Sequence, residues 1–191
     1  YIIDLKQTLY GLDAAYTFVS NLTRKGGTVL FVGTKKQAQE AVADAANRCG
    51  MPYVNARWLG GMLTNFATIR TRVKRMEELE AMDADGRMAL LPKKEQILLH
   101  KELAKLQTNL NGIRNMKKVP DAIFVIDTNR EGIALHEAHR LEIPVVGTLD
   151  TNCDPDDVDY GIPANDAAIR SVRLLADFMA DAVIAGTGRG A

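Results

Sequence analysis

Three short apolar runs most strongly limit what this chain can fold into. They lie at residues 28–32 (TVLFV), 122–126 (AIFVI) and 144–149 (PVVGTL), and each is apolar at consecutive positions. A strand that is apolar on both faces is typical of a parallel sheet that is covered by helices on both sides. Apolar residues at helical spacing flank these runs, so the sequence predicts an α/β fold with a parallel sheet.

The α/β pattern is interrupted between the first and second runs. Apolar residues recur at three- and four-residue steps along 66–82 and again along 99–113, with a turn at 83–92 between them. Each seam is narrow, and the second has heptad spacing, which is typical of a coiled coil. The sequence therefore predicts two antiparallel helices that form a hairpin.

This interruption gives a prediction for the organisation of the chain. We expect residues 1–62 and 119–191 to form the α/β domain, with residues 63–118 as an inserted helical hairpin. The segment 153–163 is rich in Asp and Pro and is expected to be a loop.

The formal net charge of the 191 residues is zero, but the charges are unevenly distributed. Residues 57–118 carry 13 Lys and Arg against 7 Asp and Glu, a net charge of +6, and the remainder carries 11 against 17, a net charge of −6. Such a division indicates a basic face for a polyanion. Chance segregation of solvated charges is the alternative.

The two cysteines, Cys49 and Cys153, have neither a CxxC partner nor a His at ligand spacing. This argues against a disulfide framework or a structural zinc site and fits a reducing compartment. No apolar run approaches the roughly 18 residues that cross a bilayer, so we expect no membrane partner. Because Tyr1 falls within an apolar segment, we expect the natural N-terminus to be missing.

The first predicted strand is followed by Gly33, Thr34, Lys35 and Lys36, at the expected start of a helix. Backbone N–H groups at a helix N-terminus attract anions, and the two lysines add positive charge. The segment matches neither GxxxxGK[ST] nor GxGxxG. An RNA phosphate, an ordinary strand-to-helix turn and a nucleotide site therefore remain as alternatives, and the nucleotide site has the weakest support.

Carboxylates follow the second and third predicted strands. Asp127, Asp150 and Asp154 lie where the carboxyl ends of parallel strands meet, and oxygen ligands there suit Mg²⁺. Asx-turns and helix caps are the favoured alternative, so we expect no cofactor. The run His136-Glu137-Ala138-His139 has its histidines at i and i+3 rather than in HExxH, and we interpret it as a solvated helix face.

The basic stretch at 57–75 carries the strongest functional signal. Arg57 and Trp58 offer a guanidinium and a flat ring, both usable against nucleotides, and Gly60-Gly61 allows close backbone approach. These features favour an RNA-binding surface. In the alternative interpretation, Trp58 belongs to the core and the cations only make the hairpin soluble.

Five motifs resemble those of a known family, that of the second protein of the bacterial small ribosomal subunit. They are FVGTKKQAQ (31–39), YVNARWLGGMLTNFATI (53–69), LNGIRNM (110–116), PDAIFVIDT (120–128) and IPVVGTLDTNCDPDDVDYGIPANDAAIRS (143–171). They run in family order across nearly the whole chain, and several are too long for chance. The chain departs from the family at Glu142, where Gly is common, and at Gly147, where Ala is common.

The resemblance implies a flavodoxin-like, three-layer α/β fold with a protruding helical hairpin. It implies a structural component of the cytoplasmic small ribosomal subunit that binds ribosomal RNA and neighbouring ribosomal proteins, near the large ribosomal protein that captures messenger RNA. It implies no catalysis and no small-molecule substrate. The expected RNA-binding residues are Lys35, Lys36, Arg57, Trp58, Arg70, Arg72, Lys74, Arg75, Arg114, Lys117 and Lys118.

Two other functions remain as alternatives from the residues alone. One is an enzyme that uses the Asp-lined strand ends with a nucleotide or a sugar phosphate. The sequence speaks against it because a complete phosphate loop and a catalytic dyad are both lacking. The other is a module that binds only proteins through the hairpin, and it predicts no salt-sensitive affinity for RNA.

Overall fold

The computed structural model describes residues 5–150, 153–164 and 169–188. Its centre is a sheet of parallel strands in the order β2-β1-β3-β4-β5. The strands are β1 (Val29–Val32), β2 (Tyr53–Val54), β3 (Ala122–Val125), β4 (Val145–Leu149) and β5 (Tyr160–Pro163). The predicted α/β fold with a buried parallel sheet is confirmed.

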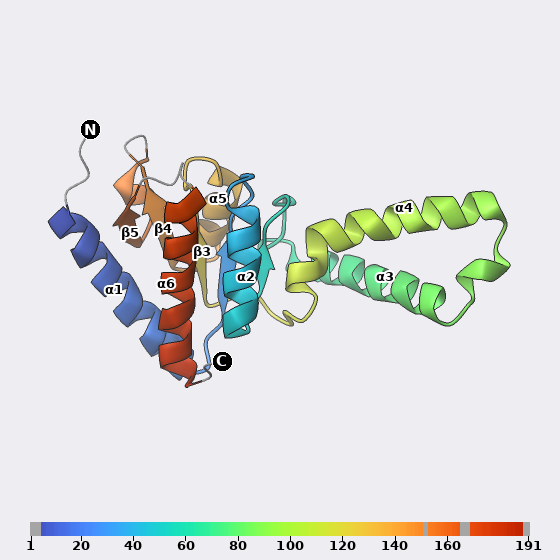
Figure 1. The fold of residues 1–191 in the computed structure, drawn as a ribbon, viewed down its shortest axis with the longest axis horizontal. Helices are drawn as coiled ribbons and strands as arrows, with labels where there is room; N and C mark the ends of the chain where they lie inside the picture. Colours follow the sequence, from blue (N-terminus) through green and yellow to red (C-terminus); the bar gives the residue numbers. More distant parts are fainter. Residues whose placement is uncertain (1–4, 151–152, 165–168, 189–191) are drawn as a thin grey trace.

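Six α-helices accompany the sheet within the described residues. They are α1 (Leu5–Arg24), α2 (Gln39–Cys49), α3 (Phe66–Ala84), α4 (Lys93–Leu110), α5 (Gly132–Arg140) and α6 (Ile169–Thr187). Short 3-10 turns lie at η1 (Met88–Leu90), η2 (Asn111–Ile113) and η3 (Pro155–Asp157). Helices α1, α2 and α6 cover one face of the sheet, and α5 lies on the other (Figure 1).

Alternation along each strand builds the two faces. In β1, Val29 and Phe31 pack towards α1, α2 and α6, whereas Leu30 and Val32 pack towards α5. Both sets are buried, as the continuous apolar run requires, because successive side chains of a strand point to opposite faces. This gives the three-layer arrangement that the resemblance implies.

The segment 153–163 contains a strand that the sequence did not predict. Residues Tyr160–Pro163 form β5, which pairs with β4 at the edge of the sheet. An edge strand tolerates Gly161 and Pro163, since only one side of it takes part in the ladder. The loop prediction was therefore wrong for these four residues.

Helices α3 and α4 lie side by side and project away from the sheet (Figure 1). Ile69, Val73, Met76 and Leu79 form the buried stripe of α3, and Leu103 and Leu110 are buried in α4. This apolar stripe is continuous with the α5 side of the sheet core. The division of the chain at residues 63 and 118 stays a prediction.

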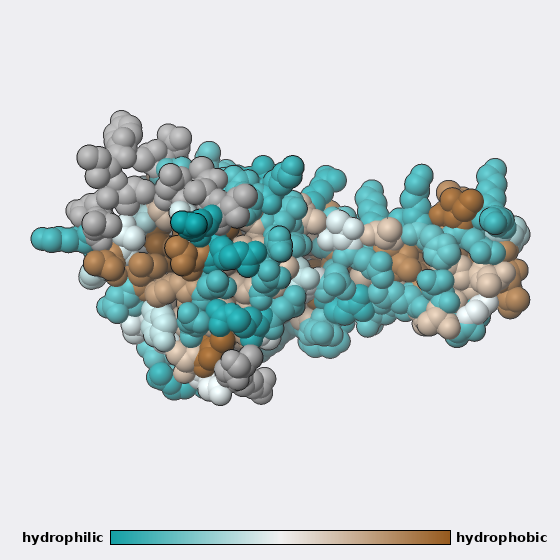
Figure 2. Space-filling view, viewed as in Figure 1, coloured by the Kyte–Doolittle hydropathy of each residue, from teal (hydrophilic) through white to brown (hydrophobic). Residues whose placement is uncertain are grey.

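The far end of the hairpin carries apolar surface, which Figure 2 shows beyond the hydrophilic middle part. Leu90, Ile97 and Leu98 are large apolar residues of this region that are exposed. Among the described residues, no helix combines the length and apolarity needed to cross a bilayer.

Candidate nucleic-acid interface

The turn at 57–64 is held in place by one buried carboxylate, that of Glu137 on α5. Oε2 of Glu137 accepts hydrogen bonds from the indole N–H of Trp58 at 3.1 Å and the backbone N–H of Gly61 at 2.8 Å. Oε1 accepts from the backbone N–H groups of Leu63 at 2.9 Å and Thr64 at 3.1 Å, and from the Thr64 hydroxyl at 3.2 Å. The carboxylate thus fixes the point where the chain leaves the sheet for the hairpin.

The environment of Glu137 favours its charged form. Glu137 is only 5% exposed, and burial by itself raises the pKa of a carboxyl group. The hydrogen bonds from Gly61, Leu63, Trp58 and Thr64 outweigh burial and lower the pKa below its usual value. The interpretation of 136–139 as a solvated helix face was therefore wrong for Glu137 and Ala138, which are buried, whereas His136 and His139 are exposed.

Two features of the turn explain the residues found there. Gly61 has φ +93°, in the left-handed region that favours glycine, and a Cβ at this position would lie 2.9 Å from Cβ of Asn65. Trp58 is 8% exposed, with its ring in the core cluster on the α5 side of the sheet. Trp58 therefore anchors the turn, which is the alternative that the sequence left open.

Arg57 lies on the solvent side of the same turn. It is exposed, and it borders a pocket of about 220 Å³ together with Thr34, Trp58, Arg130 and Glu131. Arg130 is held there by a hydrogen bond from its Nε to the Thr34 hydroxyl at 3.0 Å. The turn thus presents the Arg57 guanidinium while it buries the neighbouring ring.

The turn after β1 already holds a carboxylate of the chain. The Thr34 N–H donates to Oε2 of Glu131 at 2.9 Å, and the Thr34 hydroxyl donates to the same oxygen at 2.7 Å. Helix α2 begins only at Gln39, without a side-chain cap, so both lysines lie in the turn rather than in the first turn of the helix. The anion-attracting groups of this turn are therefore partly satisfied internally.

The two lysines of this turn have different environments. Lys35 is 7% exposed, and its Nζ lies 3.5 Å from Oδ2 of Asp127. Lys36 is exposed. Only Lys36 of this pair faces solvent in a way that suits contact with a large polyanion.

Three of the expected arginines of the hairpin are engaged within the protein. Arg70 donates from Nη1 to the carbonyl oxygens of Arg114 at 2.9 Å and Met116 at 3.2 Å. Arg75 pairs with Glu102 across the hairpin at 2.9 Å. The guanidinium of Arg114 pairs with Glu80 at 2.8 Å, so all three arginines tie one part of the hairpin to another.

These pairs also shift pKa values in the expected directions. Hydrogen bonding to Arg75 holds the pKa of Glu102 below its usual value, and hydrogen bonding to Arg114 does the same for Glu80. Both pairs are partly exposed, so water and salt weaken them and each adds only modestly to stability.

The remaining expected cations face solvent. All are exposed, and none has an ion pair within the described part of the chain: Lys36, Arg57, Arg72, Lys74, Lys117 and Lys118. Because each is exposed and makes no ion pair with the described residues, this set is the part of the predicted surface that suits phosphate groups.

The candidate magnesium ligands do not form a cluster. Asp127 accepts a hydrogen bond from the Arg130 N–H at 3.2 Å and pairs with Lys35. Asp154 caps η3 by accepting from the Asp156 N–H at 2.9 Å. Among the residues that the structure describes, no three His, Cys, Asp or Glu side chains gather where one ion would reach them. For Asp127 and Asp154 the structure thus shows the favoured alternative of turns and caps.

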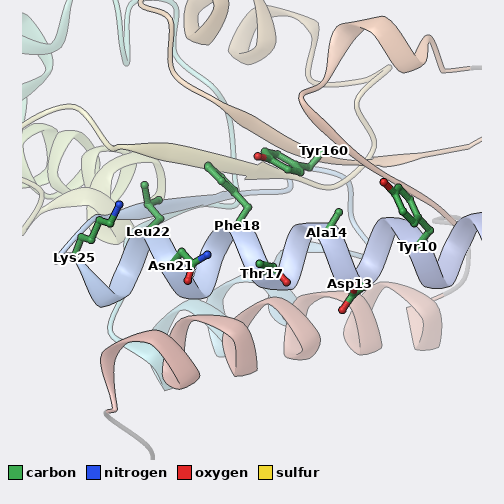
Figure 3. A pocket seen from close by; sticks show the side chains of 9 residues that line it. All are labelled: Tyr10, Asp13, Ala14, Thr17, Phe18, Asn21, Leu22, Lys25 and Tyr160. Atoms are coloured by element: carbon green, nitrogen blue, oxygen red, sulfur yellow. The ribbon is translucent and has the colours of Figure 1, made fainter.

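Two larger hollows lie elsewhere on the surface. One, of about 540 Å³, lies between α1 and Tyr160 of β5, where Phe18 stacks on Tyr160 with ring centroids 4.4 Å apart (Figure 3). The other, of about 910 Å³, lies at the root of the hairpin and includes Arg114, Lys117 and Lys118. The second groove also includes Arg24, which the sequence did not single out.

The signals for the missed residues differ. Glu137 lies three residues after Ala134 and directly before Ala138, both buried residues of α5, so its place on the buried side of the helix was readable from the sequence. Arg24 had no comparable signal, since it is far in the sequence from the segment at 111–118 with which it lines the groove.

The sequence matches known proteins over nearly its whole length. Residues 1–186 match the protein family described as Ribosomal protein S2. The chain is 61% identical over 187 residues to the small ribosomal subunit protein uS2 of Micrococcus luteus, covering 97% of this chain and 66% of that protein. The chain thus spans about two thirds of the length of this relative. The match across nearly the whole chain shows that it belongs to the ribosomal protein S2 family.

Proposed function

We propose that this chain is a structural constituent of the small ribosomal subunit and binds small-subunit ribosomal RNA through phosphate contacts. Its family is one of ribosomal proteins rather than enzymes, and the relative from Micrococcus luteus carries the name of a small-subunit protein. The observation that carries the RNA contact is the set of six exposed cations without an internal ion pair among the described residues.

The division between engaged and exposed cations assigns them different tasks. Lys36, Arg57, Arg72, Lys74, Lys117 and Lys118 are the proposed phosphate contacts. A cation that neutralises a phosphate releases condensed counterions, which drives binding and makes it depend on salt. A cation that already pairs with a carboxylate contributes less to this release, so Arg75 and Arg114 act mainly on the shape of the hairpin.

We also propose that the protein contacts neighbouring small-subunit proteins and lies near the large ribosomal protein that captures messenger RNA. The family resemblance supports this placement. Cross-linking of intact small subunits followed by mass spectrometry tests it, because cross-links from this chain to that protein are expected. Cross-links only to other proteins would contradict the placement.

Sedimentation of a cell lysate tests the ribosomal assignment directly. In a density gradient at low salt, the protein is expected to sediment with the small subunits. Little of it is expected to stay at the top of the gradient. A protein that stays at the top under conditions in which other small-subunit proteins sediment would contradict the proposal.

A thermal-shift screen separates this function from the enzyme alternative. Saturable stabilisation by a nucleotide with Mg²⁺ would favour an enzyme, because a ligand that binds only the folded state raises the melting temperature. We expect no such stabilisation, since the turn after β1 already holds the Glu131 carboxylate.

A further inference from the structure

The groove at the root of the hairpin has an unusual charge balance. Among the described residues that line it are four cations and not one Asp or Glu: Arg24, Arg114, Lys117 and Lys118. The chain as a whole has as many acidic as basic residues, so the lining of this groove is more basic than the chain average. The groove is therefore locally electropositive.

Segments far apart in the sequence form this groove. The ends of α1, α2 and α6 lie together at one end of the sheet, next to the root of the hairpin (Figure 1). The segment after α4 packs closely there, because a Cβ on Gly112 would lie 2.1 Å from the carbonyl oxygen of Tyr53. This close approach fixes the wall that carries Arg114, Lys117 and Lys118.

The cations outweigh the partial charges of the helix ends. Each helix C-terminus carries about half a negative elementary charge, so three of them contribute roughly −1.5. Arg114 is balanced by Glu80, but Arg24, Lys117 and Lys118 are exposed and have no ion pair within the described residues. The balance of the groove stays positive.

We propose that this groove binds the phosphate backbone of RNA, with Arg24 of α1 as a contact opposite Lys117 and Lys118. This inference rests on the proposed RNA-binding function and names a site for it on the sheet-domain side. Arg24 extends the RNA surface from the hairpin to the end of α1.

The remaining lining favours RNA over an acidic protein segment. Asn47 and Asn115 are exposed and bring side-chain amides, which both donate and accept hydrogen bonds, and Tyr53 brings an aromatic ring. Sugar hydroxyls and bases use such groups, whereas a run of Asp and Glu needs only the cations. The volume of about 910 Å³ gives room for a backbone with its riboses.

The test compares the wild-type protein with the Arg24→Ala/Lys118→Ala variant in binding to small-subunit ribosomal RNA at several salt concentrations. The slope of log affinity against log salt is expected to become shallower by about 0.7–0.9 for each lost cation. Within the described residues, the side chain of Arg24 makes one hydrogen bond, an exposed one to Asn21, so the melting temperature should stay near that of the wild type.

Arg140→Ala is the matched control. Like Arg24, Arg140 is an exposed arginine in the last turn of its helix, but it lies on α5 and outside the groove. Its replacement should leave the salt slope unchanged. An effect of Arg140→Ala equal to that of the double variant per lost cation would contradict the proposed groove, because it would show that any surface charge has the same weight.

Two other outcomes separate the groove from the function on which it rests. A steep wild-type slope that the double variant leaves unchanged would contradict RNA binding in the groove but would leave the RNA-binding function in place. No salt-dependent affinity in the wild type would overturn both. Displacement of the RNA by polyglutamate as effectively as by an unlabelled RNA of equal charge would assign the groove to an acidic protein segment instead.

Discussion

The sheet domain and the helical hairpin bury their apolar residues in different ways. Strands β1 and β3 are buried on both faces, between three helices on one side and α5 on the other. Helices α3 and α4 share one narrow stripe, and the rest of each surface meets solvent. The hairpin therefore holds its shape with a thin core plus ion pairs such as Arg75–Glu102 and Arg114–Glu80.

This contrast teaches that cations of the same segment have two kinds of task. Where a basic side chain reaches across to another part of the chain, it stabilises the protrusion. Where it is exposed and makes no ion pair within the described residues, we propose that it contacts a polyanion. Experiments that compare members of the two groups, or the two regions, test this distinction.

The largest expected effect comes from opening the core of each region. Phe124→Ala in the sheet should cost about 3–5 kcal/mol, and Leu79→Ala in the hairpin about 2–5 kcal/mol, because each leaves a cavity in a fully buried site. If 63–118 is a separate unit, Leu79→Ala should speed hydrogen exchange in α3 and α4 but not in β1 and β3. Equal acceleration in the strands would contradict the division of the chain.

Removing the Glu137 carboxylate, which lies between the two regions, should cause the next largest loss of stability. Glu137→Ala leaves donors at Trp58, Gly61, Leu63 and Thr64 without their acceptor, at a cost of about 3 kcal/mol. Urea unfolding measures this loss. His136→Ala, at the exposed neighbour, is the control and should change stability by less than about 0.5 kcal/mol. Similar losses in both variants would mean that Glu137 does not hold the turn.

The lowered pKa of Glu137 predicts a pH dependence of stability. Its contribution is complete above the pKa of the unfolded chain, about 4.3, and is lost as pH falls through the lower folded-state pKa. The stability difference between wild type and Glu137→Gln should therefore shrink below about pH 4. A difference that stays constant down to pH 2 would show that the charge of Glu137 is not what stabilises the turn.

A smaller effect is expected when the two groups of cations are compared: replacing an engaged cation should lower the free energy of unfolding more than replacing an exposed one. Arg114→Ala removes the partner of Glu80 and should cost about 1 kcal/mol, whereas Lys117→Ala should stay within about 0.5 kcal/mol. Thermal unfolding at low salt compares the two variants. Equal melting temperatures would place Arg114 with the exposed cations.

Sequence patterns predicted the sheet and both helical seams because burial imposes a period on each element. The strand at Tyr160–Pro163 was missed because an edge strand needs neither a continuous apolar run nor a regular alternation, and it tolerates Gly and Pro. Whether Trp58 belongs to the core was left open, because its environment depends on Glu137, which follows 79 residues later. The pairing of Arg70, Arg75 and Arg114 likewise depends on how α3 and α4 align, which a seam alone does not give.

Salt-dependent binding to small-subunit ribosomal RNA, measured on two double variants, tests the central claim most directly. Arg72→Ala/Lys74→Ala removes exposed cations, and Arg70→Ala/Arg75→Ala removes engaged ones from the same helix. The first is predicted to reduce the log–log salt slope by about 0.7–0.9 for each lost cation and to keep the stability, and the second to lower the stability and largely keep the slope. The opposite pattern, with the slope lost only in the second variant, would contradict the account.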